Sequence, residues 1–256
     1  KLMRVPMQRY FVHPKQIANQ DQMILITGDD VHHISRVMRL RPGDEVVCCD
    51  GMGLDYLTEI IRISPDAVLC RILQQFPSKG EPRTQITIAQ SIPKGDKMDW
   101  ILQKGTELGC SGFLPFFSER TIVKLDPKKR RQRTVRWQRI VKEAAEQAQR
   151  GKIPTVSVPL TWQELLQEIK RRQVAWLLYE KGGIPIKQAL ADTQENELLV
   201  IIGPEGGFSD QEVEEAKENG AIPVSLGERI LRTETASLVA LTCIQFAKSE
   251  LGGEKG

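Results

Sequence analysis

The chain has 256 residues, of which 27% are charged and 40% hydrophobic, and its formal net charge is +3. This composition is typical of a soluble globular protein with one large or two modest domains. The longest apolar runs, such as 198–202, are far too short to span a bilayer, which excludes a membrane-spanning chain. The first residues lack the apolar core of a signal peptide, and because the chain begins at Lys1 we expect Met7 to be the natural start.

The cysteines and histidines predict neither a disulfide framework nor a metal site. The five cysteines form no C-x-x-C pair. With an odd count and no export signal, reduced thiols in the cytoplasm are the simplest interpretation. The three histidines, His13, His32 and His33, lack the spaced Cys/His partners of a zinc site. We therefore expect a cytoplasmic protein with no metal and no membrane partner.

The positive charge is concentrated in one segment. Between Lys124 and Lys152, 11 basic residues stand against three acidic ones, which gives this segment +8 and leaves −5 for the rest of the chain. A concentrated basic segment on a slightly acidic protein indicates a surface that binds a polyanion. A solvated helix face explains the same charges equally well.

Two domains are expected, joined by a linker at 77–84. In the first, 1–76, short β-prone runs alternate with Gly, Asp and Pro turns, and one helix is expected over 30–40, so the pattern favours a small β-barrel. In the second, 85–256, strands alternate with helices, which is typical of an α/β domain with a parallel sheet. The expected strands are 9–12, 23–27, 45–49, 56–63, 67–73, 86–91, 113–117, 174–179, 198–202 and 222–226.

The helices of the second domain have clear end signals. Asp126 followed by Pro127 predicts the start of a long basic helix. Thr161 to Glu164 and Ser209 to Glu212 are capping boxes, and Gly109 is expected to close a helix over 96–108. The last helix, 235–251, is apolar around most of its circumference, so it is either a core helix or a subunit contact.

A glycine turn follows one of the buried strands. Gly203-Pro204-Glu205-Gly206-Gly207 stands between the strand 198–202 and the helix that Ser209 opens. Such turns cradle phosphates on backbone N–H groups, yet Glu205 would repel a phosphate. A second turn, 225–233, and the strand end 177–180 are expected at the same edge, where parallel sheets bind ligands.

Known nucleotide and hydrolase motifs are absent from the sequence. There is no G-x-G-x-x-G after a strand, no G-x-x-x-x-G-K-[ST] and no G-x-S-x-G. A cationic sulfonium ligand that carries no phosphate fits a negative glycine turn better than a triphosphate does, so S-adenosylmethionine is a candidate. The alternative is that Gly206 and Gly207 only close a strand–helix turn.

Four motifs together resemble a known family. They are KGDKMDWILQKGTELG, EAAEQ, IGPEGGF and LGERILRTETA, which occur in order and with ordinary spacing. They closely resemble the bacterial ribosomal RNA uridine-N3 methyltransferases of the RsmE type, in the SPOUT superfamily, and the similarity runs from about Met7 to the end. The one departure noted is Gly105, where related sequences often have alanine.

The resemblance implies a PUA-like N-terminal barrel, a SPOUT domain with a C-terminal trefoil knot, and a homodimer. It implies methyl transfer from S-adenosylmethionine to N3 of one uridine in the 16S ribosomal RNA of the small ribosomal subunit. It also implies a cofactor site built from residues of the three strand ends: Leu178, Tyr179, Ile202, Gly203, Pro204, Glu205, Gly206, Gly207, Leu226, Gly227, Ile230, Leu231, Arg232, Thr233 and Ala236.

The reaction requires that the weakly acidic N3 proton leaves, so we looked for a base and for a cation that stabilises the uridylate anion. The candidates are Arg232, as the cation or as a phosphate contact, and Glu205, as a cofactor ligand or the base. Glu234 is a second candidate acid. Its alternative role is structural, as a negative charge at the start of the last helix. Trp100 and Trp137 are expected in the core. The residues expected to bind RNA are Arg9, Arg36, Arg39, Arg41, Lys94, Arg136 and Arg139, and Lys97 and the rest of the run from Lys128 to Arg139 could add to that surface.

Two rival functions remain open from the sequence. A non-catalytic RNA-binding adaptor would keep the basic surface but bind no S-adenosylmethionine. A related enzyme acting on another RNA, such as the ribose of transfer RNA, would bind the cofactor and label a different atom.

Overall fold

The computed structural model describes residues 7–251. The prediction that Met7 is the natural start concerns residues 1–6, which lie outside this range. The chain divides into two compact units, one of residues up to 81 together with 145–153, the other of 82–144 together with 154 onward. The division therefore gives the end of the long basic helix to the first unit, whereas the sequence placed all of it in the second domain.

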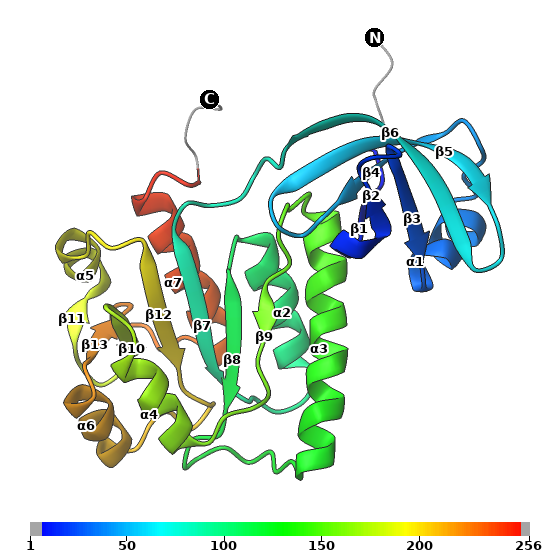
Figure 1. Ribbon diagram of the computed structural model, residues 1–256. Helices are drawn as coiled ribbons and strands as arrows, with labels where there is room; N and C mark the ends of the chain where they lie inside the picture. The colour runs from blue at the N-terminus through cyan, green and yellow to red at the C-terminus, as the bar shows by residue number, and fades with distance from the viewer. Residues whose placement is uncertain (1–6, 252–256) are drawn as a thin grey trace. The chain divides into compact units, whose positions relative to one another are not determined.

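The first unit is a β-barrel-like sheet with a small apolar core (Figure 1). Its six strands lie in the order β1-β4-β5-β6-β3-β2, and every pair is antiparallel except β1 with β4. The side chains of Ile24, Val46 and Ile60 alternate inward along their strands and are fully buried. The strands are β1 (Arg9–Phe11), β2 (Ile17–Ala18), β3 (Met23–Thr27), β4 (Glu45–Cys49), β5 (Leu54–Ile63) and β6 (Ala67–Pro77).

The helix predicted over 30–40 is shorter than expected and changes type. Helix α1 (Asp29–His32) passes directly into a π-helical turn, η2 (His33–Val37), and the only other helical piece described in this unit before β4 is the short η1 (Pro14–Gln16). The backbone N–H of Met38 donates to the carbonyl of His33, five residues back, and Ser35 Oγ donates to the carbonyl of Val31. Such bonds widen the turn and interrupt a regular α-helix.

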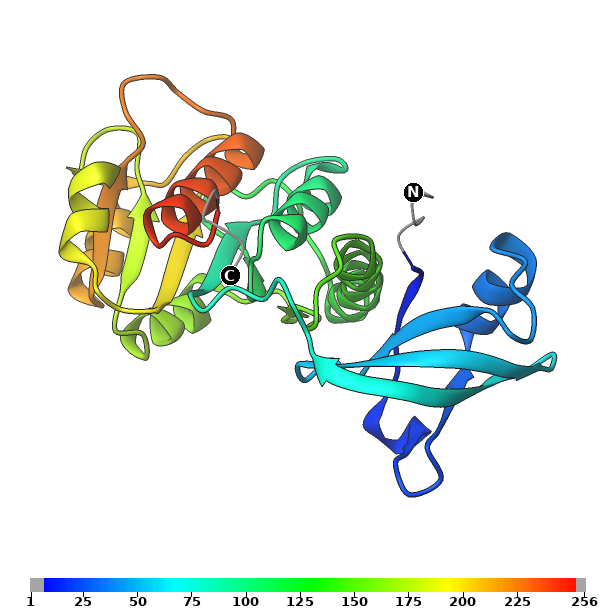
Figure 2. The same cartoon turned by 90° about the horizontal axis from the view of Figure 1, so that it is seen from above.

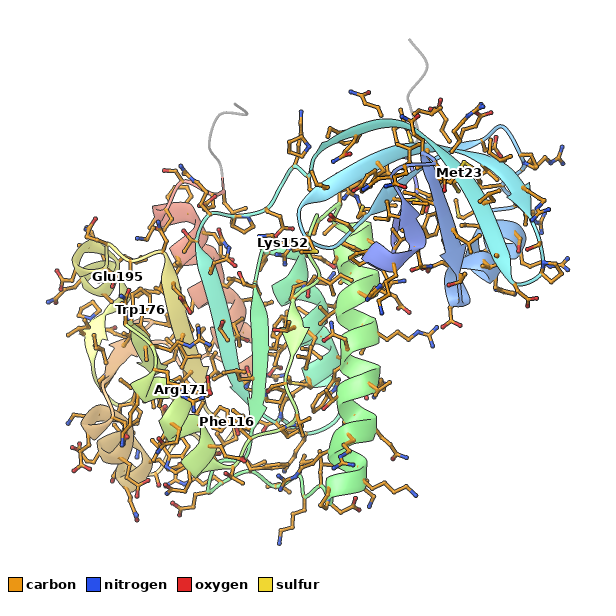
Figure 3. The ribbon with its side chains drawn as sticks, viewed as in Figure 1. Met23, Phe116, Lys152, Arg171, Trp176 and Glu195 are labelled. Atoms are coloured by element: carbon orange, nitrogen blue, oxygen red, sulfur yellow. The ribbon has the colours of Figure 1, made fainter. Side chains whose placement is uncertain are left out.

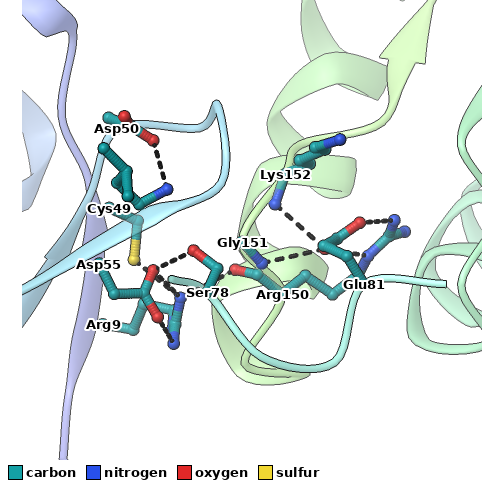
Figure 4. A network of polar contacts seen from close by, with 10 residues as sticks. Arg9, Cys49, Asp50, Asp55, Ser78, Glu81, Arg150, Gly151 and Lys152 are labelled. Carbon is teal, nitrogen blue, oxygen red and sulfur yellow. Dashed lines mark hydrogen bonds and ion pairs between the residues drawn. The ribbon is translucent and has the colours of Figure 1, made fainter. Parts of the chain in front are cut away.

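A buried polar network ties the linker and residues 150–152 to the barrel (Figure 4). Arg9 makes a two-pronged ion pair with Asp55, at 2.9 and 2.7 Å, and also donates to the carbonyl of Arg150. Ser78 Oγ donates to Asp55, while Glu81 accepts from the Arg150 side chain at 2.9 Å and from the backbone N–H of Gly151. These bonds explain why residues 145–153 belong to the first unit.

The assignment of Arg9 to RNA binding is therefore corrected. The Arg9 side chain is only 7% exposed and its partner Asp55 only 1%. A guanidinium buried against a carboxylate is not available to a phosphate, and the sequence offered no sign of Asp55, which is 46 residues away. Arg9 is a structural residue of the barrel.

We expect the substitution Arg9→Met to lower the free energy of unfolding of the first unit by about 3–5 kcal/mol, because it leaves the Asp55 carboxylate buried without its cation. Urea unfolding followed by circular dichroism measures this change. Arg71→Met is the matched control, since its ion pair with Glu59 is largely exposed and is worth at most about 1 kcal/mol. Unchanged stability of Arg9→Met together with a loss of RNA affinity would return Arg9 to the RNA-binding surface.

The second unit is built on a sheet of seven parallel strands, in the order β11-β13-β10-β12-β7-β8-β9 (Figure 1). This confirms the predicted α/β architecture with a parallel sheet. The two-residue strands β9 and β11 were missed, because so short a segment carries no periodicity. The strands are β7 (Gln85–Ser91), β8 (Gly112–Phe116), β9 (Thr155–Val156), β10 (Ala175–Leu178), β11 (Ile184–Pro185), β12 (Glu197–Ile202) and β13 (Ala221–Ser225).

Helices cover both faces of this sheet (Figures 1 and 2). Helices α4 (Trp162–Lys170) and α6 (Asp210–Glu218) pack their apolar side chains on one face, around Phe116, Leu177 and Ile201. Helices α2 (Lys97–Glu107) and α7 (Thr233–Ala247) pack together on the other. The remaining helices of the unit are α5 (Ile186–Asp192) and α3 (Pro127–Gln147), whose last residues belong to the first unit.

The predicted helix starts are confirmed. The carboxylate of Asp126 accepts from the backbone N–H of Lys129 at 2.8 Å, and both capping boxes, Thr161 with Glu164 and Ser209 with Glu212, are formed. Gly105 is explained as well, because a Cβ there would lie 2.9 Å from the Phe113 ring. Helix α2 therefore packs more closely on β8 than an alanine would allow without a shift of that ring.

One of the expectations about burial fails. Trp137 and Trp176 are fully buried (the latter labelled in Figure 3), but Trp100 is 43% exposed, so its assignment to the core is wrong. Helix α7 buries Ala240, Leu241 and Ile244, whereas Phe246 is 70% exposed. A helix that is apolar around its circumference is expected to pack against other elements. The pattern does not show how much of the helix surface is buried within a single chain.

No helix within residues 7–251 is long and apolar enough to cross a membrane. All five cysteines are free thiols.

Candidate cofactor-binding site

A cavity of about 490 Å³ opens at the carboxyl edge of the parallel sheet. It lies where β10, β12 and β13 end, as the topology of parallel α/β sheets leads one to expect. Every residue of the predicted cofactor set, from Leu178 to Ala236, lines this one cavity. Five lining residues were outside the predicted cofactor set: Lys97, Glu180, Phe208, Glu228 and Arg229. Three of them, Glu180, Glu228 and Arg229, lie in the strand end and the turn that were expected at this edge.

The glycine turn after β12 needs its glycines. The backbone N–H of Gly207 donates to the carbonyl of Pro204 at 2.9 Å, which closes the turn, and Gly207 has a φ of +67°. A Cβ at Gly207 would lie 2.6 Å from Glu180 Oε1, and a Cβ at Gly203 would lie 3.1 Å from the Phe208 ring. The turn thus lets the backbone approach the cavity closely at positions where a side chain would intrude.

A buried hydrogen-bonded chain holds this turn to two other elements. Thr233, the first residue of α7, donates its hydroxyl to the carbonyl of Gly203 at 2.7 Å. Gln90, at the end of β7, donates its side-chain N–H to the same hydroxyl at 2.8 Å. Both side chains are buried, so the bonds are shielded from water. These two bonds therefore fix the ends of β7 and β12 relative to the start of α7.

The negative charge of the turn is balanced by a lysine. Lys97 Nζ lies 2.9 Å from Glu205 Oε1 and 3.6 Å from Glu234 Oε2, and the backbone N–H of Lys94 also donates to Glu205. Burial alone would raise the pKa of Glu205, but the bonds from Lys97 and Lys94 outweigh it and the pKa lies below its usual value. Glu205 is therefore an ionised carboxylate and a weak base, which favours a binding role over proton abstraction.

The second turn forms the opposite wall. Gly227 has a φ of +108°, and Ile230 beside it is 86% exposed. Arg232 is the N-cap residue of α7: its carbonyl accepts from the backbone N–H of Ala236 at 2.8 Å, and it is exposed. Its guanidinium thus stands at the rim of the cavity on a backbone that the helix fixes.

The residues predicted to bind RNA are exposed, apart from Arg9. Arg36, Arg39 and Arg41 are exposed on and after the π-helical turn of the first unit. In the second unit Lys94 is exposed beside the glycine turn, Arg136 pairs with Asp99, and Arg139 pairs with Glu143 at 2.9 Å. These exposed pairs contribute little stability, so they leave both arginines available to another anion.

Sequence reasoning missed the residues that support the turn. Lys97 and Gln90 lie far along the chain from Glu205 and Thr233, and no local pattern joins them. Lys97 stands within the motif KGDKMD and was grouped with the residues that could bind RNA, whereas the structure pairs it with Glu205. Within residues 7–251 there is no group of metal-ligating side chains that would hold an ion.

Comparisons with known proteins identify the family. A model described as an RNA methyltransferase domain matches residues 80–245, and one described as an RNA methyltransferase PUA domain matches residues 26–73. The protein named ribosomal RNA small subunit methyltransferase E from Bacillus subtilis is 40% identical, over 97% of this chain and 100% of its own length. The chain belongs to the ribosomal RNA small subunit methyltransferase E family.

Solved structures of methyltransferase relatives agree. A small subunit methyltransferase E from Neisseria gonorrhoeae, bound to S-adenosyl methionine, is 32% identical with a TM-score of 0.83, over 94% of this chain and 97% of its own. A methyltransferase from Legionella pneumophila, in complex with the same cofactor, is 30% identical with a TM-score of 0.85, over 95% and 98%. The expected PUA-like domain and parallel-sheet methyltransferase domain are thus confirmed.

The cavity suits the cofactor that these two solved structures contain. Its size lies in the usual range for small-molecule sites, and its apolar residues, such as Leu178, Leu226 and Leu231, stand beside backbone groups of two turns. The lining carries three carboxylates, Glu180, Glu205 and Glu228, and three basic side chains, Lys97, Arg229 and Arg232. Carboxylates accept hydrogen bonds from amino and hydroxyl groups such as those of S-adenosylmethionine, so the residues present fit this cofactor.

We expect Gly207→Val to weaken S-adenosylmethionine binding at least about tenfold, because the new side chain enters the cavity and strains a residue with positive φ. Isothermal titration calorimetry measures the dissociation constant. Gly220→Val is the matched control, since its φ is +100° but nothing lies within 4 Å of a Cβ there. Equal affinity in Gly207→Val and wild type would place the cofactor elsewhere.

We expect Lys97→Met to raise the pKa of Glu205, because burial is then no longer outweighed by the lysine bond. In the wild type the folded-state pKa of Glu205 is depressed, so its stabilising contribution is present above the usual glutamate pKa of 4.5 and is lost as pH falls through the folded-state pKa. Carbon-13 NMR titration of labelled glutamates, assigned with Glu205→Gln, measures the shift. An unchanged Glu205 titration in Lys97→Met would show that Lys97 does not control this carboxylate.

Proposed function

We propose that the protein transfers a methyl group from S-adenosylmethionine to N3 of one uridine in the 16S ribosomal RNA of the small ribosomal subunit. The observation that carries the proposal is the cavity, whose glycine turn, balanced carboxylate and rim arginine come together in a chain of the methyltransferase E family. The names of the relatives support the ribosomal RNA substrate, and the sequence motifs support the N3 position.

The cofactor is held by the two turns and the strand ends. The backbone around Gly203 to Gly207 and around Gly227, together with Leu178 and Leu226, forms the walls, and Glu205 lines the same cavity. S-adenosylmethionine bound there would supply an electrophilic methyl group.

Arg232 is the residue proposed to promote the reaction. Uridine N3 becomes a good nucleophile once its proton has left, and the resulting anion carries charge on the ring oxygens. A guanidinium at the cavity rim stabilises that charge before and during the attack. Glu205 acts as a cofactor ligand, because its pKa is depressed and Lys97 holds its Oε1.

The RNA-binding surface is proposed to include both units. Arg36, Arg39 and Arg41 serve the PUA-like unit, whereas Lys94, Arg136 and Arg139 serve the methyltransferase unit. The excess of basic residues between 124 and 152 supports a polyanion as partner. Each residue alone is an ordinary surface charge, so the argument depends on the set.

A homodimer, a C-terminal trefoil knot and a cytoplasmic location complete the proposal. The exposed apolar side chains Trp100 and Phe246, on the two helices α2 and α7 that pack together, support a second copy as partner. The placement of β13 between β10 and β11, after the chain has already built β12, supports a crossing of the kind that a knotted SPOUT domain requires. Free thiols support a reducing compartment.

We expect small ribosomal subunits that lack the modification to receive the labelled methyl group of S-adenosylmethionine as N3-methyluridine, identified by mass after digestion of the RNA. Arg232→Met is expected to lower kcat by roughly 10²–10³-fold, the cost of removing one group that stabilises a developing anion. Label in another nucleoside would keep the methyltransferase and reject the N3 position. No label and no cofactor binding would favour an RNA-binding adaptor.

A further inference from the structure

A short segment beside the cavity has no role in the proposed function so far. Ser118, Glu119, Arg120 and Thr121 follow β8 at the carboxyl edge of the sheet, next to the glycine turn. No motif of the sequence pointed to them as a site. Their geometry shows a backbone that is fixed on its inner side and an arginine that is exposed on its outer side.

Buried hydroxyl groups fix the inner side of this segment. The hydroxyl of Thr121 lies 2.9 Å from that of Ser91, at the end of β7, and 2.9 Å from that of Ser118. It also accepts from the backbone N–H of Ser118 at 2.8 Å. Ser91 and Ser118 are buried, so these bonds are not exchanged for bonds to water.

A second anchor comes from helix α6. The backbone N–H of Glu119 donates to Glu212 Oε1 at 2.8 Å, and Glu212 is only 4% exposed. The same carboxylate closes the capping box with Ser209, directly after the glycine turn. The segment is therefore bound to the end of β7 and to helix α6, and Arg120 stands between two fixed neighbours.

Arg120 lies against the outside of the glycine turn. Its Nη1 donates to the carbonyl of Gly206 at 2.8 Å, and a Cβ at Gly206 would lie 3.5 Å from Arg120 Cβ and Cδ. Gly206 lines the cavity but Arg120 does not. An anion bound by this guanidinium thus lies outside the cavity, at its edge, and not within it where the cofactor sits.

The rest of the guanidinium is available. Among residues 7–251, Arg120 Nε and Nη2 have no hydrogen-bond partner, and Asp210, the acid that Arg120 influences, already accepts from Tyr179 and Lys181. A planar fork with free N–H groups matches the geometry of a phosphate.

The basic surface of α3 continues to this place. The segment leads through Leu125 directly into α3, and Arg130 of that helix holds the connection by donating to the carbonyl of Leu125 and stacking 4.6 Å from the Phe117 ring. Arg120 is thus the point at which the connection to the basic helix meets the cofactor turn.

We propose that Arg120 binds the RNA phosphate next to the nucleotide that enters the cavity, while its bond to Gly206 keeps the guanidinium at the edge of the cofactor site. The inference rests on the proposed methylation of RNA. It assigns to the site an RNA contact that couples placement of the target nucleotide to the turn that holds the cofactor.

The test compares Arg120→Met, Arg120→Lys and a matched control, Arg171→Met. Arg171 is exposed at the C-terminal end of α4 and, among the residues that the structure describes, its side chain pairs with Glu168 alone. The probes are an unmodified 16S ribosomal RNA transcript at several salt concentrations and, for kinetics, small ribosomal subunits lacking the modification. S-adenosylmethionine binding is measured in each variant by calorimetry, which also checks that the site is folded.

For Arg120→Met we expect roughly tenfold weaker RNA binding, as for a lost charge-assisted hydrogen bond, and a salt slope reduced by about one phosphate. The KM for RNA rises by a similar factor, whereas the dissociation constant of S-adenosylmethionine changes less than about twofold. Arg120→Lys keeps the salt slope and recovers part of the affinity, because the charge remains but the fork is lost.

The opposite pattern overturns the inference. A raised KM for S-adenosylmethionine with an unchanged salt slope would show that Arg120 only holds the Gly206 carbonyl. The two proposals fail separately. If the wild type forms no N3-methyluridine but Arg120→Met still flattens the salt slope, the RNA contact stands and the reaction is rejected; if the wild type methylates and the slope is unchanged, only the contact is rejected.

Discussion

The hydrogen bond from Thr233 to the carbonyl of Gly203 is the interaction on which the site depends. It joins the end of a central strand to the first residue of the last helix, and Gln90 extends it to the neighbouring strand. Because the bond is buried, losing it would leave a carbonyl unsatisfied in the interior, which costs more than the bond itself contributes. The two turns that form the cavity walls are held in place from this point.

Charged side chains lie around the glycine turn that this bond holds. Glu205 stands on a turn that admits close backbone approach, and Lys97 keeps it ionised while also facing Glu234. Two carboxylates against one ammonium leave a single negative charge in this group of three residues. In the proposed function, the exposed arginines Arg232 and Arg120 serve the anionic substrate.

Local signals in the sequence predicted much of this arrangement. Capping residues such as Asp126 and Ser209 set helix starts, continuous apolar runs predicted buried parallel strands, and glycines marked the turns, since each signal acts within a few residues. What failed depends on distant partners. Arg9 was assigned to RNA because nothing near it reveals Asp55, and Trp100 was placed in the core because periodicity does not show which faces one chain covers. The residues from 145 to 153 were assigned to the wrong unit for the same reason.

That last feature has a consequence for synthesis on the ribosome. The barrel strands are complete by Pro77, but Arg150 to Lys152, which bond to Arg9 and Glu81, are made about 70 residues later. At a synthesis rate of roughly 5–20 residues per second, this final segment is made several seconds after the last barrel strand. During that interval Arg9 lacks its hydrogen bond to the carbonyl of Arg150. The first unit is therefore completed only after part of the second unit has emerged. A fragment cut after residue 81 would represent this waiting state and not the finished barrel.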